Sequence, residues 1–230
     1  MTDVGMTDGG MTSEERPLLV KSSDGPVSLL INRRVSRLFS GPMARAGFTP
    51  NSATLISLLI GAAACAAYAA QAWWAGGLLL QFSSIFAGVD GEIARLTDRA
   101  SRYGDFFDTV SDRLVEYLSI LAVAYGLAQT DRWENWAWPI GLVTLGATFM
   151  LASASEKYRS VMHENYPKRQ LEPLFAYIVS GRDVRVLFLA VASVAATWNV
   201  DVLLWTLVAM TALVHVNFLY RVVIVRSRMA

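Results

Sequence analysis

Apolar residues along the chain gather into long runs that are separated by short polar connections. The runs lie at about 51–70, 75–95, 104–127, 138–156, 184–197 and 201–225. Most of them approach the ~20 residues that a helix needs to cross the hydrocarbon core of a bilayer. The run at 184–197 is shorter and also fits a buried or tilted segment. We therefore expect an all-α, polytopic membrane protein with six transmembrane helices.

The segment before the first run has a different pattern. Residues 27–47 mix leucine, valine and phenylalanine with Arg33, Arg34 and Arg37. This mixture predicts an amphipathic interfacial helix whose arginines face lipid phosphates, with a helix packed on protein as the alternative. Residues 1–26 are acidic and rich in Gly, Thr and Ser, so we expect a disordered tail there. The membrane domain would then occupy residues 27–230, with its six spans between 50 and 225.

Composition agrees with a membrane protein. Hydrophobic residues make up 54% of the 230 residues and the mean hydropathy is +0.38, above what soluble globular chains usually show. The single cysteine, Cys65, excludes an intramolecular disulfide. No nucleic-acid partner is expected, and the lipid bilayer is the partner that the composition implies. Whether the chain forms a homodimer is left open.

The basic residues are unevenly distributed. Tryptophans cluster in the connections at 71–74, 128–138 and 198–201, as in an interfacial belt, and of the 20 Lys and Arg residues only Arg132 lies in these connections. Positive charge marks the cytoplasmic side of a membrane protein. We therefore expect a multi-pass protein of the plasma (inner) membrane with both termini and the 157–185 loop in the cytoplasm.

Three carboxylates interrupt or flank the apolar runs. Asp90 lies in the second run, after apolar residues that start near Ala75, and Asp108 and Asp112 lie four residues apart on one face of the third. A carboxylate at the membrane rim costs several kcal/mol unless it is paired or bound, and we expect the three to converge where the helices meet. Oxygen ligands without Cys or His favour Mg²⁺ or Mn²⁺ together with a phosphate-bearing substrate. The alternative is that these groups cap helix ends or pair with Arg95 and Arg113.

The same stretch resembles a known signature. It reads Ala87-x-x-Asp90-Gly91-x-x-Ala94-Arg95, then eight residues, then Gly104-x-x-x-Asp108-x-x-x-Asp112. This is similar to the signature of the CDP-alcohol phosphotransferases, Asp-x-x-Asp-Gly-x-x-Ala-Arg followed by Gly-x-x-x-Asp-x-x-x-Asp, and the resemblance covers residues 30 to about 225. The one departure is Ala87, where the family has an aspartate that helps to hold the catalytic metals.

The resemblance implies a fold, an activity and a set of site residues. Members transfer a substituted phosphate group from a CDP-linked donor, often CDP-diacylglycerol, to an alcohol or polyol phosphate such as inositol phosphate, and release CMP in phospholipid biosynthesis. It implies Asp90, Asp108 and Asp112 as ligands of Mg²⁺ or Mn²⁺, with Asp112 also as the catalytic base. The positions that match donor contacts are Pro50, Asn51, Gly91, Ala94, Arg95, Ser101 and Gly104.

The basic 157–185 loop is a candidate for the acceptor pocket. Its segment from Gly181 to Arg185 is similar to one in members that accept phosphorylated polyols, and cationic side chains hold anionic acceptors through charge-assisted hydrogen bonds. We expect Lys157, Arg182 and Arg185 to contact the acceptor. A basic cytoplasmic loop is also the default in any membrane protein.

Two other functions compete with an active transferase. Because Ala87 cannot coordinate a metal, the chain could be an impaired family member that binds nucleotide or lipid without turnover. A transporter with intramembrane carboxylates is disfavoured, since the charges sit at one rim and not at a midplane site between repeats.

The predicted topology is tested by cysteine labelling. In a Gln129→Cys variant the new thiol reacts with an impermeant reagent added outside the cell, because residue 129 follows the third span on the external side. In a Lys168→Cys variant it is shielded. The opposite labelling pattern would reverse the orientation.

Overall fold

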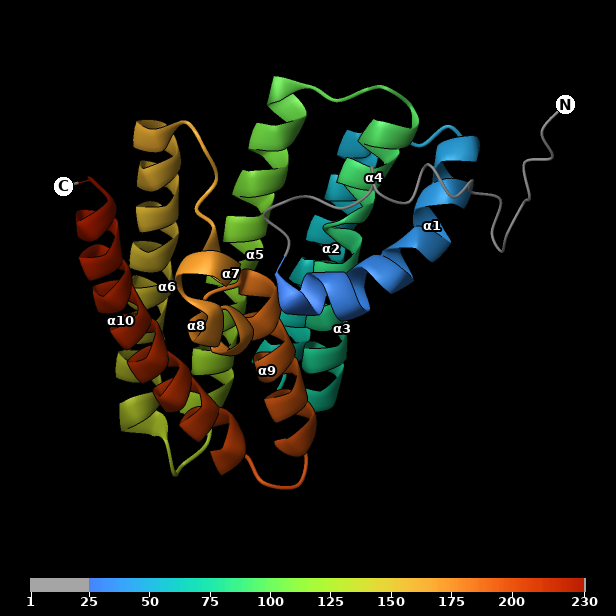
Figure 1. Cartoon of the computed structure of the whole chain (residues 1–230). Helices are drawn as coiled ribbons and strands as arrows, with labels where there is room; N and C mark the ends of the chain where they lie inside the picture. Colours follow the sequence, from blue (N-terminus) through green and yellow to red (C-terminus); the bar gives the residue numbers. More distant parts are fainter. Residues whose placement is uncertain (1–24, 230) are drawn as a thin grey trace, which may run out of the picture.

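The computed structural model describes residues 25–229, and within them all regular secondary structure is helical (Figure 1). The all-α class is confirmed, whereas the predicted disordered tail lies outside the described residues except for Gly25 and Pro26. The elements are the short π-helix η2 (Ser28–Asn32), α1 (Arg33–Arg45), α2 (Pro50–Ala69), α3 (Trp73–Phe86), α4 (Val89–Leu96), α5 (Arg102–Ala128), α6 (Glu134–Met162), α7 (Lys168–Leu171), α8 (Pro173–Ile178), α9 (Arg182–Ala195) and α10 (Asp201–Met229).

Six of these helices close a ring. Helix α2 packs on α3 and α5, α3 packs on α9, α9 on α10, α10 on α6, and α6 on α5. Helix α1 runs obliquely to the bundle and contacts α4 and α3 (Figure 1). The ring brings α5 and α9, which are distant in sequence, close enough for side chains at their N-terminal halves to meet.

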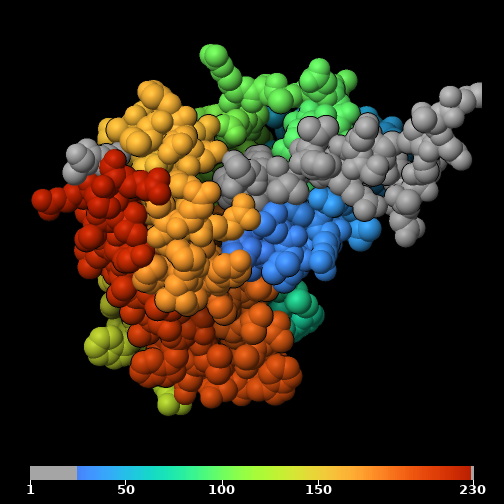
Figure 2. Space-filling view, in the orientation of Figure 1, coloured from blue at the N-terminus to red at the C-terminus, as the bar shows by residue number. Residues whose placement is uncertain are grey.

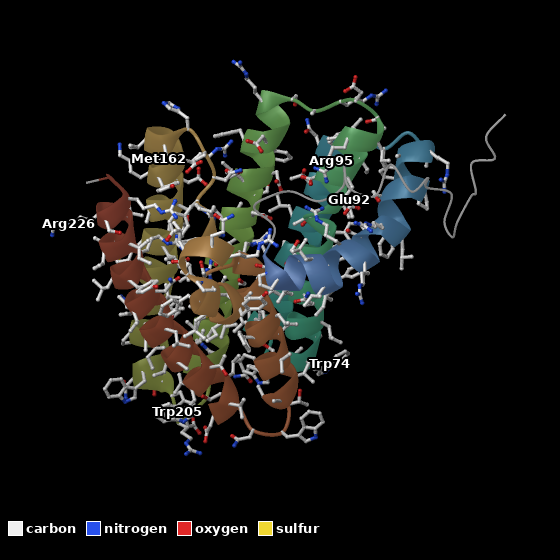
Figure 3. All side chains as sticks on the ribbon, in the orientation of Figure 1. Trp74, Glu92, Arg95, Met162, Trp205 and Arg226 are labelled. Atoms are coloured by element: carbon white, nitrogen blue, oxygen red, sulfur yellow. The ribbon has the colours of Figure 1, made fainter. Side chains whose placement is uncertain are left out.

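Three helices of the described part, α2, α6 and α10, are long and apolar enough to cross a membrane. For α3, α5 and α9 the predicted spans stay a prediction. The polar and aromatic ends of the bundle are distinct: Trp74 and Trp205 lie at the end opposite Arg95 and Met162 (Figure 3). The side of the membrane that each end faces stays a prediction.

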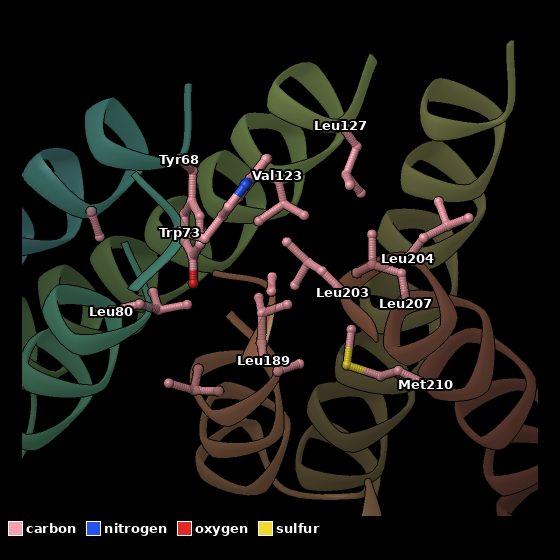
Figure 4. Close-up of a cluster of buried hydrophobic side chains, with 14 of the residues drawn as sticks. Tyr68, Trp73, Leu80, Val123, Leu127, Leu189, Leu203, Leu204, Leu207 and Met210 are labelled. Carbon is pink, nitrogen blue, oxygen red and sulfur yellow. The ribbon is translucent and has the colours of Figure 1, made fainter. Parts of the chain in front are cut away.

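The hydrophobic core lies inside the ring. Tyr68, Trp73 and Leu80 from α2 and α3 face Leu189 of α9 and side chains of α5 and α10 (Figure 4). The Tyr68 hydroxyl and Ser193 Oγ are 2.9 Å apart, which satisfies both buried polar groups. The core therefore fixes α3, α5 and α9 relative to one another and supports the charged end of the bundle.

The predicted continuous run at 75–95 is not one helix. Helix α3 ends at Phe86 and α4 begins at Val89, so the predicted run is interrupted at residues 87 and 88. At the break the Gly88 carbonyl accepts a hydrogen bond from Arg33 Nη1 at 3.0 Å. A Cβ at Gly88 would lie 2.9 Å from Arg33 Nη1, so a larger residue there would displace the end of the Arg33 side chain.

The N-terminal segment forms η2 and α1 within the predicted 27–47 helix, but one of its arginines does not face lipid. The Arg33 side chain is buried and pairs with the buried Glu92 at 3.0 Å, and Ser36 Oγ donates to the same carboxylate oxygen at 2.7 Å. Arg34 is exposed, as are Leu30 and Leu38. Helix α1 thus combines a face packed on α4 with exposed apolar and basic side chains.

Close packing of α3 on α9 predicts a matched pair of substitutions. In Gly77→Ala the new Cβ would lie 2.7 Å from the Ala190 carbonyl oxygen, whereas at Gly146 nothing lies within 4 Å. Because overpacking costs about 1–3 kcal/mol, Gly77→Ala should unfold about 2–12 °C below Gly146→Ala. Thermal unfolding in one detergent measures the difference, and equal midpoints would contradict this packing.

Candidate functional site

The first candidate pocket lies where α2 and α5 begin. Thr49 caps α2 and shares a reciprocal pair of hydrogen bonds with Ser52, while Ser101 caps α5 by accepting the Gly104 N–H at 3.0 Å. Backbone N–H groups at helix N-termini favour anions. The pocket is lined by Pro50, Asn51, Thr54, Asp90, Gly91, Ala94, Arg95, Arg99, Ala100, Ser101, Gly104, Asp105 and Asp108. All seven predicted donor positions are therefore brought together.

Asp90 is fixed in this pocket by its neighbours. Its side chain is buried, Thr54 Oγ1 donates to Oδ2 at 2.6 Å, and the Gly91 N–H donates to Oδ1. Sequence reasoning missed Thr54. The signal was available, since Thr54 follows Pro50 by four residues and so shares its helical face.

A second pocket adjoins the first at Asp108. It is lined on one side by Ala87, Gly88, Asp108 and Asp112. Its cationic lining consists of Arg33, Lys168 and Arg182. Position 87 thus lines the same pocket as Asp108 and Asp112, and it lies in the break between α3 and α4, whereas Asp90 lies in α4.

The three predicted metal ligands do not form one cluster. Asp90 and Asp108 line the first pocket, while Asp108 and Asp112 line the second. Among residues 25–229 no group of three or more His, Cys, Asp or Glu side chains is placed to hold a metal ion by itself. Asp108 is the member that both pockets share.

Two ion pairs connect α5 to the start of α9. Arg182 Nη1 lies 2.7 Å from Asp112 Oδ1, and one turn further into the bundle Arg185 Nη2 lies 2.5 Å from Glu116 Oε1. Arg185 Nη1 also donates to the Val179 carbonyl oxygen at 2.9 Å. Arg185 is therefore held in the protein interior and does not line either pocket, whereas Arg182 faces the second one.

The lysines of the basic loop differ in their surroundings. Lys157 is exposed and lines none of these pockets. Lys168 lines the second pocket and also a third, next to Asp108, Asp112 and Arg159. Removal from water lowers the pKa of Lys168 to about 8. Sequence reasoning placed Lys168 in the basic loop but could not distinguish it from the exposed Lys157.

Comparison with known proteins decides the family. A family model described as CDP-alcohol phosphatidyltransferase matches residues 48–216. The chain belongs to this family. The match contains every carboxylate that lines the two pockets, and it includes helices α4 and α5.

Curated relatives of this CDP-alcohol phosphatidyltransferase family member include longer proteins. A bifunctional IPC transferase and DIPP synthase of Archaeoglobus fulgidus is 31% identical over 195 residues, which are 84% of this chain and 37% of the relative. An archaetidylinositol phosphate synthase of Pyrococcus horikoshii is 29% identical over 110 residues, which are 48% of this chain and 55% of the relative. The chain thus spans less than two thirds of the length of these relatives.

Solved structures agree on the fold of this family member. The phosphatidylinositol phosphate synthase of Mycobacterium tuberculosis with CDP-DAG bound superposes with a TM-score of 0.67 at 14% identity, covering 84% of this chain and 92% of that one. The same enzyme in complex with manganese and citrate gives a TM-score of 0.68 at 15% identity, covering 85% and 88%. At these identities the likeness establishes the fold.

Proposed function

We propose that the chain is a membrane-embedded, divalent-metal-dependent transferase. It moves a substituted phosphate group from a CDP-linked donor, such as CDP-diacylglycerol, to a polyol phosphate such as inositol phosphate, and it releases CMP. The observation that carries this proposal is the first pocket, where all seven expected donor contacts meet Asp90 and Asp108. The names of the relatives and the CDP-DAG-bound structural neighbour support the substrate classes.

The first pocket has the chemistry to hold a nucleoside diphosphate. The N-termini of α2 and α5 and the guanidinium groups of Arg95 and Arg99 line it and attract phosphate. Asp90 and Asp108 line it too and would repel the same phosphates. A cation between carboxylates and diphosphate resolves this conflict.

The residues fit a bound Mg²⁺ or Mn²⁺. Both pockets offer carboxylate oxygens and no sulfur or imidazole, and the hydrogen bonds from Thr54 and Gly91 hold the Asp90 carboxylate in one orientation. Mg²⁺ commonly binds through few carboxylates and completes its shell with substrate phosphates and waters. When bound, such an ion neutralises the diphosphate and stabilises the leaving CMP.

Asp112 is placed to act on the attacking alcohol. It lines both the second and the third pocket, one helical turn from Asp108. In the proposed reaction the Asp112 carboxylate accepts the proton of the acceptor hydroxyl, whose oxygen forms the new bond to phosphorus as the bond to CMP breaks. Arg182, 2.7 Å from Asp112, orients this carboxylate.

The acceptor phosphate is assigned to the cationic side of these pockets. Lys168 and Arg159 line the third pocket, and Lys168 and Arg182 line the second. Charge-assisted hydrogen bonds from such groups hold a phosphate monoester beside Asp112. Lys168 replaces Lys157 and Arg185 as the basic residue that we expect to contact the acceptor.

The membrane arrangement is part of the proposal. We assign α2, α3 with α4, α5, α6, α9 and α10 as six spans, with the charged end of the bundle on the cytoplasmic side. Exposed Leu30, Leu38 and Arg34 support α1 as an interfacial helix at that end.

Release of CMP tests the proposed activity. The purified full chain, supplied with CDP-diacylglycerol and a panel of polyols and polyol phosphates, should release CMP only when Mg²⁺ or Mn²⁺ and an acceptor are present. Asp112→Asn should lower the rate by about 10²-fold or more, because general-base catalysis contributes that much. CDP-diacylglycerol binding without CMP release would instead identify a family member that binds without turnover.

Lys168 and Lys157 form a matched pair for the acceptor site. In Lys168→Ala the acceptor KM should rise about tenfold or more through loss of a charge-assisted contact, while the donor KM stays near the native value. In Lys157→Ala the acceptor KM should also stay near the native value. Because the pKa of Lys168 is lowered to about 8, the native acceptor KM should rise above that pH as the lysine loses its proton. Lys168→Arg should remove this rise, and equal effects of both alanine variants would place the acceptor elsewhere.

A further inference from the structure

The pocket at Ala87 differs in charge from the pocket at Asp90. Around Asp90 the lining has three carboxylates, Asp90, Asp105 and Asp108, and two arginines, Arg95 and Arg99, together with the Thr54 hydroxyl and the Asn51 amide. Around Ala87 the lining has three carboxylates, Asp108, Asp112 and Asp183, and three cationic side chains, Arg33, Lys168 and Arg182. The cationic groups therefore match the carboxylates in number on the Ala87 side but not on the Asp90 side, so a divalent cation is favoured more at Asp90.

One of the three cationic groups already contacts a carboxylate that would hold a cation there. Arg182 Nη1 lies 2.7 Å from Asp112 Oδ1, and the Arg182 side chain is only 13% exposed. The contact is a direct ion pair with a delocalised, permanently charged group.

The backbone of α5 and α9 dictates the position of Arg182. One turn below, Arg185 donates to Glu116 through Nε at 3.0 Å and through Nη2 at 2.5 Å, and both side chains are buried. Asp112 precedes Glu116 by four residues and Arg182 precedes Arg185 by three, so each pair lies on one helical face. The buried inner pair thus sets the register that brings Arg182 to Asp112.

We infer that the Arg182 guanidinium takes the place of a second cation in this chain, so that the site holds one divalent ion between Asp90 and Asp108. The inference rests on the function proposed above and explains how a chain with Ala87 balances the charge of Asp112. Arg182 and the single ion would then act on opposite sides of Asp108.

Mn²⁺ binding tests the inference without turnover. The purified full chain in detergent, without substrate, is titrated with Mn²⁺ and followed by equilibrium dialysis and electron paramagnetic resonance. We expect one Mn²⁺ per native chain with an uncoupled spectrum. The Ala87→Asp/Arg182→Gln double variant should bind two magnetically coupled ions. Two ions or none on the native chain, or one ion on the double variant, would overturn the inference.

Single substitutions in the native background give a second readout that does not depend on folding of the double variant. Asp90→Asn should weaken Mn²⁺ binding about tenfold or more. Asp112→Asn should weaken it by less than about threefold, since Asp112 faces Arg182 and acts independently of the ion. Equal losses for both variants would show that Asp112 is a ligand and would refute the single-ion site.

CMP release by the same preparations separates the two proposals. A native chain that binds one Mn²⁺ but releases no CMP would refute the proposed function and support the single-ion site. A native chain that releases CMP with two bound Mn²⁺ ions would confirm the function and remove the single-ion site.

Discussion

The paired ion contacts between α5 and α9 determine how the charged end of the bundle is arranged. Glu116 and Arg185 are both buried, and removing one partner of such a pair costs about 3–5 kcal/mol because the other charge stays uncompensated. Since the pair fixes the register of α9 on α5, it also determines where Arg182 lies relative to Asp112. A buried ion pair that takes no part in the proposed reaction thereby determines where the charged groups Arg182 and Asp112 lie.

Much of the donor side could be predicted from the sequence because its residues are local. Asp90, Gly91, Ala94 and Arg95 share the short helix α4, and Ser101 and Gly104 lie in the first turn of α5. Helical periodicity and capping rules act over three or four residues, so they place such groups correctly. The same rules predicted the all-helical class but not the break within 75–95, where the Gly88 carbonyl accepts a hydrogen bond from Arg33, about 55 positions earlier.

The acceptor side could not be predicted in the same way because its contacts are distant in sequence. Lys168 and Lys157 belong to one basic loop, and only the path of α7 beside α5 separates a pocket residue from an exposed one. Likewise Arg182 and Arg185 differ by a single helical turn, yet one faces a pocket and the other is enclosed with Glu116. Composition and spacing carry no information about such pairings.

The break at residues 87 and 88 separates α4 from α3, and α4 packs on α1 and α2. Arg33 and Ser36 of α1 contact the Glu92 carboxylate. Phe39 and Met43 of α1 pack against a small apolar cluster that includes Val89 and Ile93 of α4. Figure 2 shows the blue surface of this N-terminal segment beside the orange segment of α9. Helix α1 also exposes apolar side chains. The Asp90 carboxylate is therefore carried by a helix whose position depends on α1, through one buried ion pair and one apolar contact, so a change in α1 far from the donor pocket would alter that pocket.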